Sequence, residues 1–256
     1  MTEALLAWDL LGWVLVVWTV AFGACLLAGI VRGIVGFGYA LIMISALNLV
    51  ALPAEVVPLA TILDLLGGIK MMPQVWRDVH WSGVRWLGLG ALTGVPAGIW
   101  LLVSLDADTM RLGISLAILI SVILIARGFT FAKVPGSPLM FLTGGLSGLL
   151  SGSGGIPGPP IILLYLSSPL PIISTRATTV AFFLLVDSMA LIGMSSQGLV
   201  TSQTLLRAAV LIPVTFLGIS IGAGLFKFSK PAQVKTSALW LLAVLAIVGV
   251  GKVLIP

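Results

Sequence analysis

The chain has 256 residues, of which 59% are hydrophobic and only 8% are charged. A soluble domain carries about 25% charged residues, so this chain cannot cover a water-facing surface and is predicted to be an integral membrane protein. Continuous apolar runs of about 20 residues favour helices over a transmembrane barrel, whose strands alternate apolar and polar residues. The basic residues that give the net charge of +5 are scattered at segment ends, which excludes a nucleic-acid-binding patch.

Ten apolar segments follow one another along the chain. They cover roughly residues 11–31, 34–50, 54–72, 82–103, 109–128, 138–150, 155–168, 177–198, 204–227 and 232–254. The second, sixth and seventh segments are short against the roughly 20 residues that a full span needs. Segments one and two, and segments six and seven, are therefore expected to form broken or re-entrant hairpins. The predicted fold is all-α, with eight to ten membrane segments.

The two halves of the chain resemble each other. Gly36-Phe37-Gly38 corresponds to Gly152-Ser153-Gly154, and Asp64 corresponds to Asp187. Five segments per half is an odd number, so the second copy is expected to be inverted in the membrane. The expected units are residues 1–131, the first membrane repeat, and residues 132–256, the second, inverted repeat.

Basic residues fix the expected orientation. They concentrate in three loops, after the third, fifth and ninth segments, which should all be cytoplasmic by the positive-inside rule. Their members are Lys70, Arg77, His80, Arg127, Lys133, Lys227, Lys230 and Lys235. Counting segments alternately, both termini then lie outside.

Two glycine-rich breaks interrupt the apolar pattern. The stronger break is the Gly/Ser/Pro run at 148–160, and the weaker one is Gly29–Gly38. Irregular backbone at membrane depth persists only where it is buried in protein or lines a polar cavity, and paired breaks point to a transporter's substrate site. Open N–H groups and a helix beginning near Pro159 would bind an anion. The alternative is a tight turn with small residues for close helix packing.

Four charged residues are candidates for the site: Arg32 lies at the first break, Arg176 starts the eighth segment, and two aspartates lie within segments. Arg32 and Arg176 are candidate ligands for an oxyanion, because a guanidinium offers two parallel donors; the alternative is a basic anchor at the cytoplasmic interface. Asp64 and Asp187 lie inside apolar segments, where a carboxylate is a functional hypothesis by default. Each is a candidate proton carrier, with a structural ion pair or a helix cap as the alternative.

The paired motifs give the sequence a family resemblance. The motifs are Gly33-x-x-Gly36-Phe37-Gly38, Gly148-x-x-x-Gly152-x-Gly154-Gly155, Pro159-Pro160 and Thr175-Arg176-Ala177-Thr178. Together they resemble the TauE/SafE family of sulfite exporters and related sulfonate permeases, over nearly the whole chain. The resemblance implies small anions as substrates: sulfite, organosulfonates or small carboxylates.

The sequence therefore predicts a secondary transporter for a small organic or sulfur-containing anion, working by alternating access, with protons as a candidate coupling ion. Alternatives are a cation-binding transporter, a membrane subunit of a larger assembly, or a membrane enzyme. The predicted substrate-binding residues are Arg32, Gly36, Phe37, Gly38, Ser151, Gly152, Ser153, Gly154, Gly155, Pro159 and Arg176. No cofactor, metal or nucleic-acid partner is expected. The expected location is a bacterial inner membrane, and a homo-oligomer is compatible with the sequence.

Overall fold

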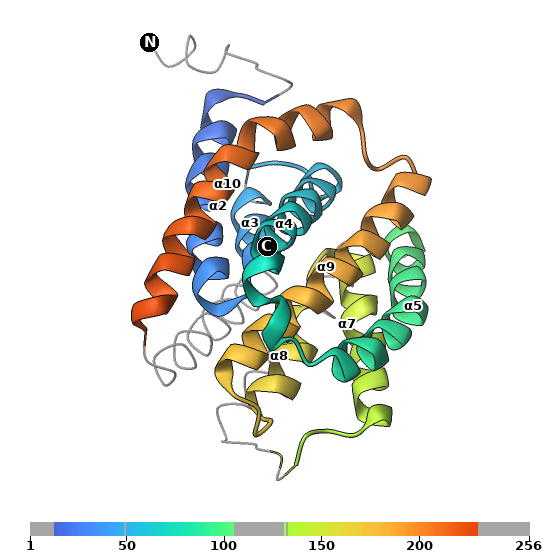
Figure 1. The fold of residues 1–256 in the computed structure, drawn as a ribbon. Coiled ribbons are helices and arrows are strands. Elements are labelled where there is room, and N and C mark those ends of the chain that lie inside the picture. The colour runs from blue at the N-terminus through green and yellow to red at the C-terminus, as the bar shows by residue number, and fades with distance from the viewer. Residues whose placement is uncertain (1–12, 49, 105–130, 132, 230–256) are drawn as a thin grey trace, which may run out of the picture.

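The computed structural model describes residues 13–48, 50–104, 131 and 133–229. This part of the chain is built from α-helices joined by short loops, with one turn of 3-10 helix (Figure 1). In chain order the elements are α2 (Leu15–Val35), α3 (Tyr39–Leu47), α4 (Pro53–Val75), η1 (Trp76–Asp78), α5 (Trp81–Ser104), α7 (Ser137–Gly154), α8 (Gly158–Leu166), α9 (Ile172–Ser196) and α10 (Ser202–Phe228).

The prediction of an all-α membrane protein is confirmed. Four described helices are long and apolar enough to cross a membrane: Leu15–Val35, Glu55–Asp78, Ile172–Ser196 and Ser202–Phe228. Eight of the ten predicted segments each hold one helix near the expected bounds. The other two, at 109–128 and 232–254, lie outside the described residues.

The length of the sixth segment was predicted wrongly. Helix α7 is 18 residues long and runs through the Ser/Gly run to Gly154, whereas the expected irregular backbone began at Gly148. The glycines remain helical because α7 packs closely on α5: a Cβ on Gly148 would lie 2.9 Å from Cα of Ala91, and one on Gly152 would lie 2.9 Å from the nitrogen of Ile99. Packing of this kind compensates for the weak helix propensity of glycine.

Both hairpin turns are three residues long and begin with a left-handed glycine. Gly36 has φ 89° after α2, and Gly155 has φ 67° after α7. A nine-residue helix follows each turn. Nine helical residues span about 14 Å, half of a hydrocarbon core about 30 Å thick, so the second and seventh segments are short as predicted. Gly36 therefore corresponds to Gly155, not to Gly152 as the sequence suggested.

Helices from the two halves of the chain pack closely on each other. The most extensive contacts among the described helices join α5 to α7 and α2 to α10, so that the first described helix of each half packs on the last described helix of the other half. Along α2, Gly29 packs on Gly218 and Gly33 on Gly222, which makes α2 and α10 parallel. Helices α5 and α7 are likewise parallel, with Gly148 packed on Ala91 and Gly152 on Val95.

Helices α4 and α9 lie at the centre, between these two pairs (Figure 1). They run antiparallel, because the His80 nitrogen donates to Thr178 Oγ1 near one end while Gly68 contacts Leu184 further along. Helix α4 is parallel to α10, since Glu55 binds Arg207 and Lys70 binds Phe216 and Ser220. As a result α4 and α10 end at the same side of the bundle at which α9 begins.

Candidate functional site

The centre of the candidate site is a buried ion pair between Arg32 of α2 and Asp64 of α4. Nη1 of Arg32 contacts Oδ1 of Asp64, and both side chains are almost completely buried. Arg32 lies one helical turn before Gly36, where α2 ends. Its guanidinium carbon lies 5.8 Å from the centroid of the Phe183 ring of α9. A burial this complete rules out the interfacial anchor that was the alternative for Arg32.

Arg176 lies in the first turns of α9 and packs against the first break. Its Nη2 donates to the carbonyl oxygen of Gly33 at 2.6 Å, and its guanidinium lies 4.3 Å from the Phe226 ring centroid. A Cβ on Gly36 would lie 2.8 Å from Cγ of Arg176 and 3.1 Å from its carbonyl oxygen. The structure thus brings Arg32, Arg176 and the Gly36 turn together.

Asp187 of α9 is the fourth buried charge. It interacts electrostatically with both Asp64 and Arg32, which places it in the same group. Along the chain, the separation between Gly155 and Asp187 is longer by one helical turn than the separation between Gly36 and Asp64. The two carboxylates are therefore not at equivalent positions of the two halves, although both face the boundary between α4 and α9.

Several donors and acceptors of this cluster make no hydrogen bond to any described residue. They are Nε and Nη2 of Arg32, Nε of Arg176 and Oδ2 of Asp187. Leaving a buried polar group unpaired costs about 1–3 kcal/mol, and more when the group is charged. An oxyanion held by the free edge of the Arg32 guanidinium would satisfy these donors.

The second break lies near the start of α4, away from the arginines. A Cβ on Gly155 would lie 3.0 Å from Cδ1 of Ile44, 3.1 Å from Cγ1 of Val57 and 3.6 Å from Oγ1 of Thr61. Thr61 precedes Asp64 by about one helical turn, so the second break approaches the ion pair from the opposite end. Pro159 lies in the first turn of α8, as expected.

The hypothesis that the Ser151–Gly154 backbone is open to a ligand is wrong for this structure. Gly152, Ser153 and Gly154 lie within α7, and Gly152 packs on the backbone of α5. Ser151 keeps one predicted feature, because its buried Oγ has no hydrogen-bond partner among the described residues. Ser151 stands one turn before Gly155, the position that Arg32 has before Gly36.

Phe37 lines a small enclosed cavity between the first break, α8 and the start of α9. Its other lining residues are Val35, Ile162, Leu166, Ile172, Thr175 and Thr179. The cavity measures about 10 Å³, which is close to the minimum for one water molecule. In this conformation the cavity is therefore too small for a sulfite ion.

Three residues of the site escaped the sequence reasoning: the Gly33 carbonyl, Phe183 and Phe226. Gly33 lies inside the weaker glycine run, so the sequence did point to this part of the chain. The two phenylalanines lie in apolar helices among similar residues, and nothing in their local pattern separates them from ordinary core.

Comparison with known proteins identifies the family. The sequence profile of the family described as sulfite exporter TauE/SafE matches residues 21–249. The chain belongs to the TauE/SafE family. A relative from Cupriavidus necator, named "Probable sulfite/organosulfonate exporter TauE", is 23% identical over 198 residues, which cover 74% of this chain and 76% of that protein. No solved structure matches the chain.

Membership of the TauE/SafE family makes the chain a multi-pass membrane transporter. This agrees with the buried cluster, because ionisable groups inside a membrane protein mark substrate and ion pathways. The family resemblance read from the glycine motifs is confirmed.

Proposed function

We propose that the protein transports a small organic or sulfur-containing oxyanion, bound between Arg32 and Arg176. The observation that carries this proposal is the buried Arg32–Asp64 pair beside the Gly36 turn, with unpaired donors on both arginines. The relative from Cupriavidus necator is named for sulfite and organosulfonate export, which is the same ligand class. Oxyanions of this type fit guanidinium groups, since two parallel N–H donors match two oxygens.

Charge balance at the cluster supports coupling to protons. Two arginines and two ionised aspartates sum to zero, so an arriving monoanion leaves one uncompensated negative charge in a buried site. Such a charge costs several kcal/mol, and protonation of one carboxylate removes it. Asp187 is the better proton carrier, because Asp64 is already paired with Arg32 while Oδ2 of Asp187 has no described partner. The expected cycle moves one proton with each monoanion.

We further propose that the two halves are inverted repeats that exchange outward and inward access. Matching left-handed glycines, nine-residue helices and reciprocal helix exchange support this reading. Corresponding helices α4 and α9 run in opposite directions, as inversion requires. In the described residues one unit comprises α2, α3, α4 and α10, and the other comprises α5, α7, α8 and α9. Arg32, Asp64, Arg176 and Asp187 lie along their boundary.

A cation substrate is the competing function. Two buried carboxylates favour it, and Asp187 has a free oxygen. Against it, the cluster also holds two arginines, Arg32 and Arg176, which balance the two carboxylates, so no net negative charge is left to hold a cation.

A binding panel on purified protein separates the two functions. Sulfite, alkanesulfonates and small carboxylates are titrated against wild type, Arg32→Gln, Arg176→Gln and the control Arg85→Gln, an exposed residue of α5. Hydrogen bonds to charged groups contribute about 1.5–3 kcal/mol, so each of the first two changes should weaken binding by about tenfold to a hundredfold. Unaltered anion binding in both would overturn the proposed site.

A further inference from the structure

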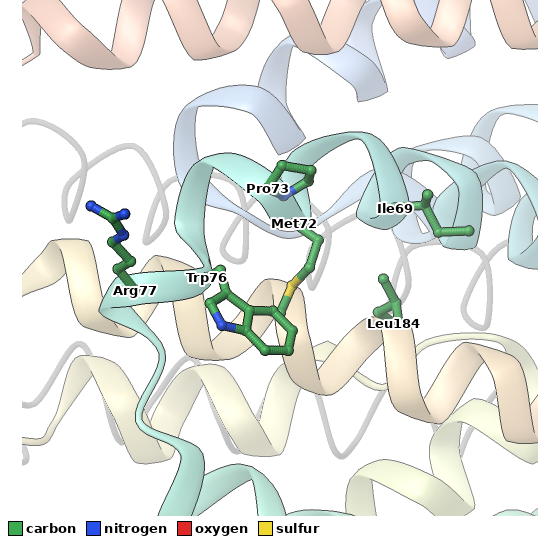
Figure 2. Close-up of a pocket in the computed structure, with 6 residues that line it drawn as sticks. All are labelled: Ile69, Met72, Pro73, Trp76, Arg77 and Leu184. Atoms are coloured by element: carbon green, nitrogen blue, oxygen red, sulfur yellow. The ribbon is translucent and has the colours of Figure 1, made fainter.

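A groove opens at the end of α4, on the side that faces α9. Figure 2 shows Ile69, Met72, Pro73, Trp76 and Arg77 along α4 and η1, with Leu184 of α9 beside Ile69. The groove holds about 460 Å³, within the range of small-molecule sites. Its walls are apolar apart from Arg77, whose side chain extends away from the indole of Trp76 at the mouth.

The inner end of this groove lies against the candidate anion site. A Cβ on Gly68 would lie 3.2 Å from Nη2 of Arg32 and 3.6 Å from both Cβ and Cδ1 of Leu184. Gly68, which has no side chain, lies between Nη2 of Arg32 and Leu184, so the groove is separated from the guanidinium by the Gly68 backbone and the Leu184 side chain. Nη2 is one of the two Arg32 nitrogens that lack a hydrogen bond among the described residues.

We infer that the groove is a vestibule that admits organic anions bearing an apolar substituent to Arg32, an inference that rests on the proposed function. The anionic head passes Arg77, whose charge attracts it, and reaches Nη2 of Arg32 when Leu184 moves aside. The substituent stays against Met72, Trp76 and Leu184, where burial contributes about 25 cal/mol per Å² of apolar area. Because Arg77 belongs to a basic loop, the vestibule opens to the cytoplasm.

Cysteine accessibility tests this inference in the Cys25→Ala background, which removes the one native cysteine. Met72→Cys is reconstituted in proteoliposomes and treated with anionic methanethiosulfonate ethylsulfonate, with butanesulfonate as the protecting ligand. Ile192→Cys is the lipid-facing control, because Ile192 of α9 is 73% exposed. Leu184→Cys serves as the second vestibule variant, and a monodisperse size-exclusion profile before reconstitution verifies that each variant is folded.

The expected result is fast modification of Met72→Cys and none of Ile192→Cys, since a thiol in lipid does not ionise. Protection should follow 1 + [L]/Kd, so butanesulfonate at about ten times its Kd should slow modification about tenfold. Absence of reaction, reaction without protection, or protection by anionic phospholipid instead of butanesulfonate would each overturn the vestibule. If any of these occurs while Arg32→Gln still weakens anion binding, the vestibule is wrong and the proposed anion site stands.

Discussion

At the residue scale, we propose that the Arg32–Asp64 pair serves both stability and transport. Both side chains are almost fully buried. A buried ion pair stabilises the fold little more than apolar residues in the same place would. Removing one partner, however, leaves an uncompensated buried charge. Replacing both partners by apolar residues should therefore restore stability for either kind of pair. It should abolish transport only if the pair is functional.

Asp64→Asn should lower the free energy of unfolding by about 3–5 kcal/mol, because Arg32 then stays buried without its counter-charge. The double variant Arg32→Met/Asp64→Leu should recover most of that loss but transport nothing. Unfolding in detergent and uptake in proteoliposomes measure the two quantities on the same samples. A double variant that transports normally would show that the pair is a structural feature alone.

The left-handed glycines offer a second residue-scale test with a matched control. Gly36 (φ 89°) touches Arg176, whereas Gly198 (φ 70°) has open space where a Cβ would be. Replacement by alanine strains the backbone by about 1 kcal/mol at either position. Only Gly36→Ala should also displace Arg176.

We therefore expect Gly36→Ala to weaken anion binding by about tenfold or more, in line with the loss of a hydrogen bond to a charged group. Gly198→Ala should leave the binding constant unchanged. Isothermal titration of the two variants with one sulfonate compares their binding constants directly. Equal effects of the two changes on the binding constant would show that the Gly36 turn is not part of the anion site.

At the scale of elements, apolar periodicity predicted where the helices lie but not where α7 ends. Gly148 and Gly152 have poor helix propensity, so the sequence favoured irregular backbone there. Their packing on α5 decides otherwise, and that contact joins residues about 55 positions apart, beyond the reach of local pattern. The short helices α3 and α8 were predictable because their length is set by the turns beside them.

The candidate site was predicted in composition but not in arrangement. Charged residues inside apolar segments are visible in the sequence, and all four chosen residues lie at the α4–α9 boundary or the first break. The pairing of Arg32 with Asp64 depends on helix rotation, and the one-turn offset of Asp187 depends on which glycine ends α7. Neither segment length nor hydrophobicity encodes that rotation.

At the scale of the whole molecule, helix directions bring the described basic loops to one end. Helix α4 ends and α7 begins at that end, whereas α9 ends at the other (Figure 1). In the chain, Asp78 closes η1 after α4, Lys133 precedes α7, and Gln197 follows α9. By the positive-inside rule, we expect the basic end to be cytoplasmic.

In the Cys25→Ala background, Gln197→Cys should react with an impermeant thiol reagent in intact cells, while Asp78→Cys and Lys133→Cys should react only after permeabilisation. The control is total labelling after solubilisation, which should be equal for the three variants. The reverse pattern would invert the orientation, and with it the side on which the vestibule opens.

The central claim is that one buried cluster binds the anion through arginine and the proton through Asp187. Its most direct test is sulfonate uptake into proteoliposomes driven by a pH gradient, measured with wild type and Asp187→Asn alongside the binding constant of each. We predict that Asp187→Asn keeps its affinity within about threefold, a change below 1 kcal/mol, and no longer accumulates substrate. Undiminished proton-driven accumulation by Asp187→Asn, or complete loss of its binding, would contradict the claim.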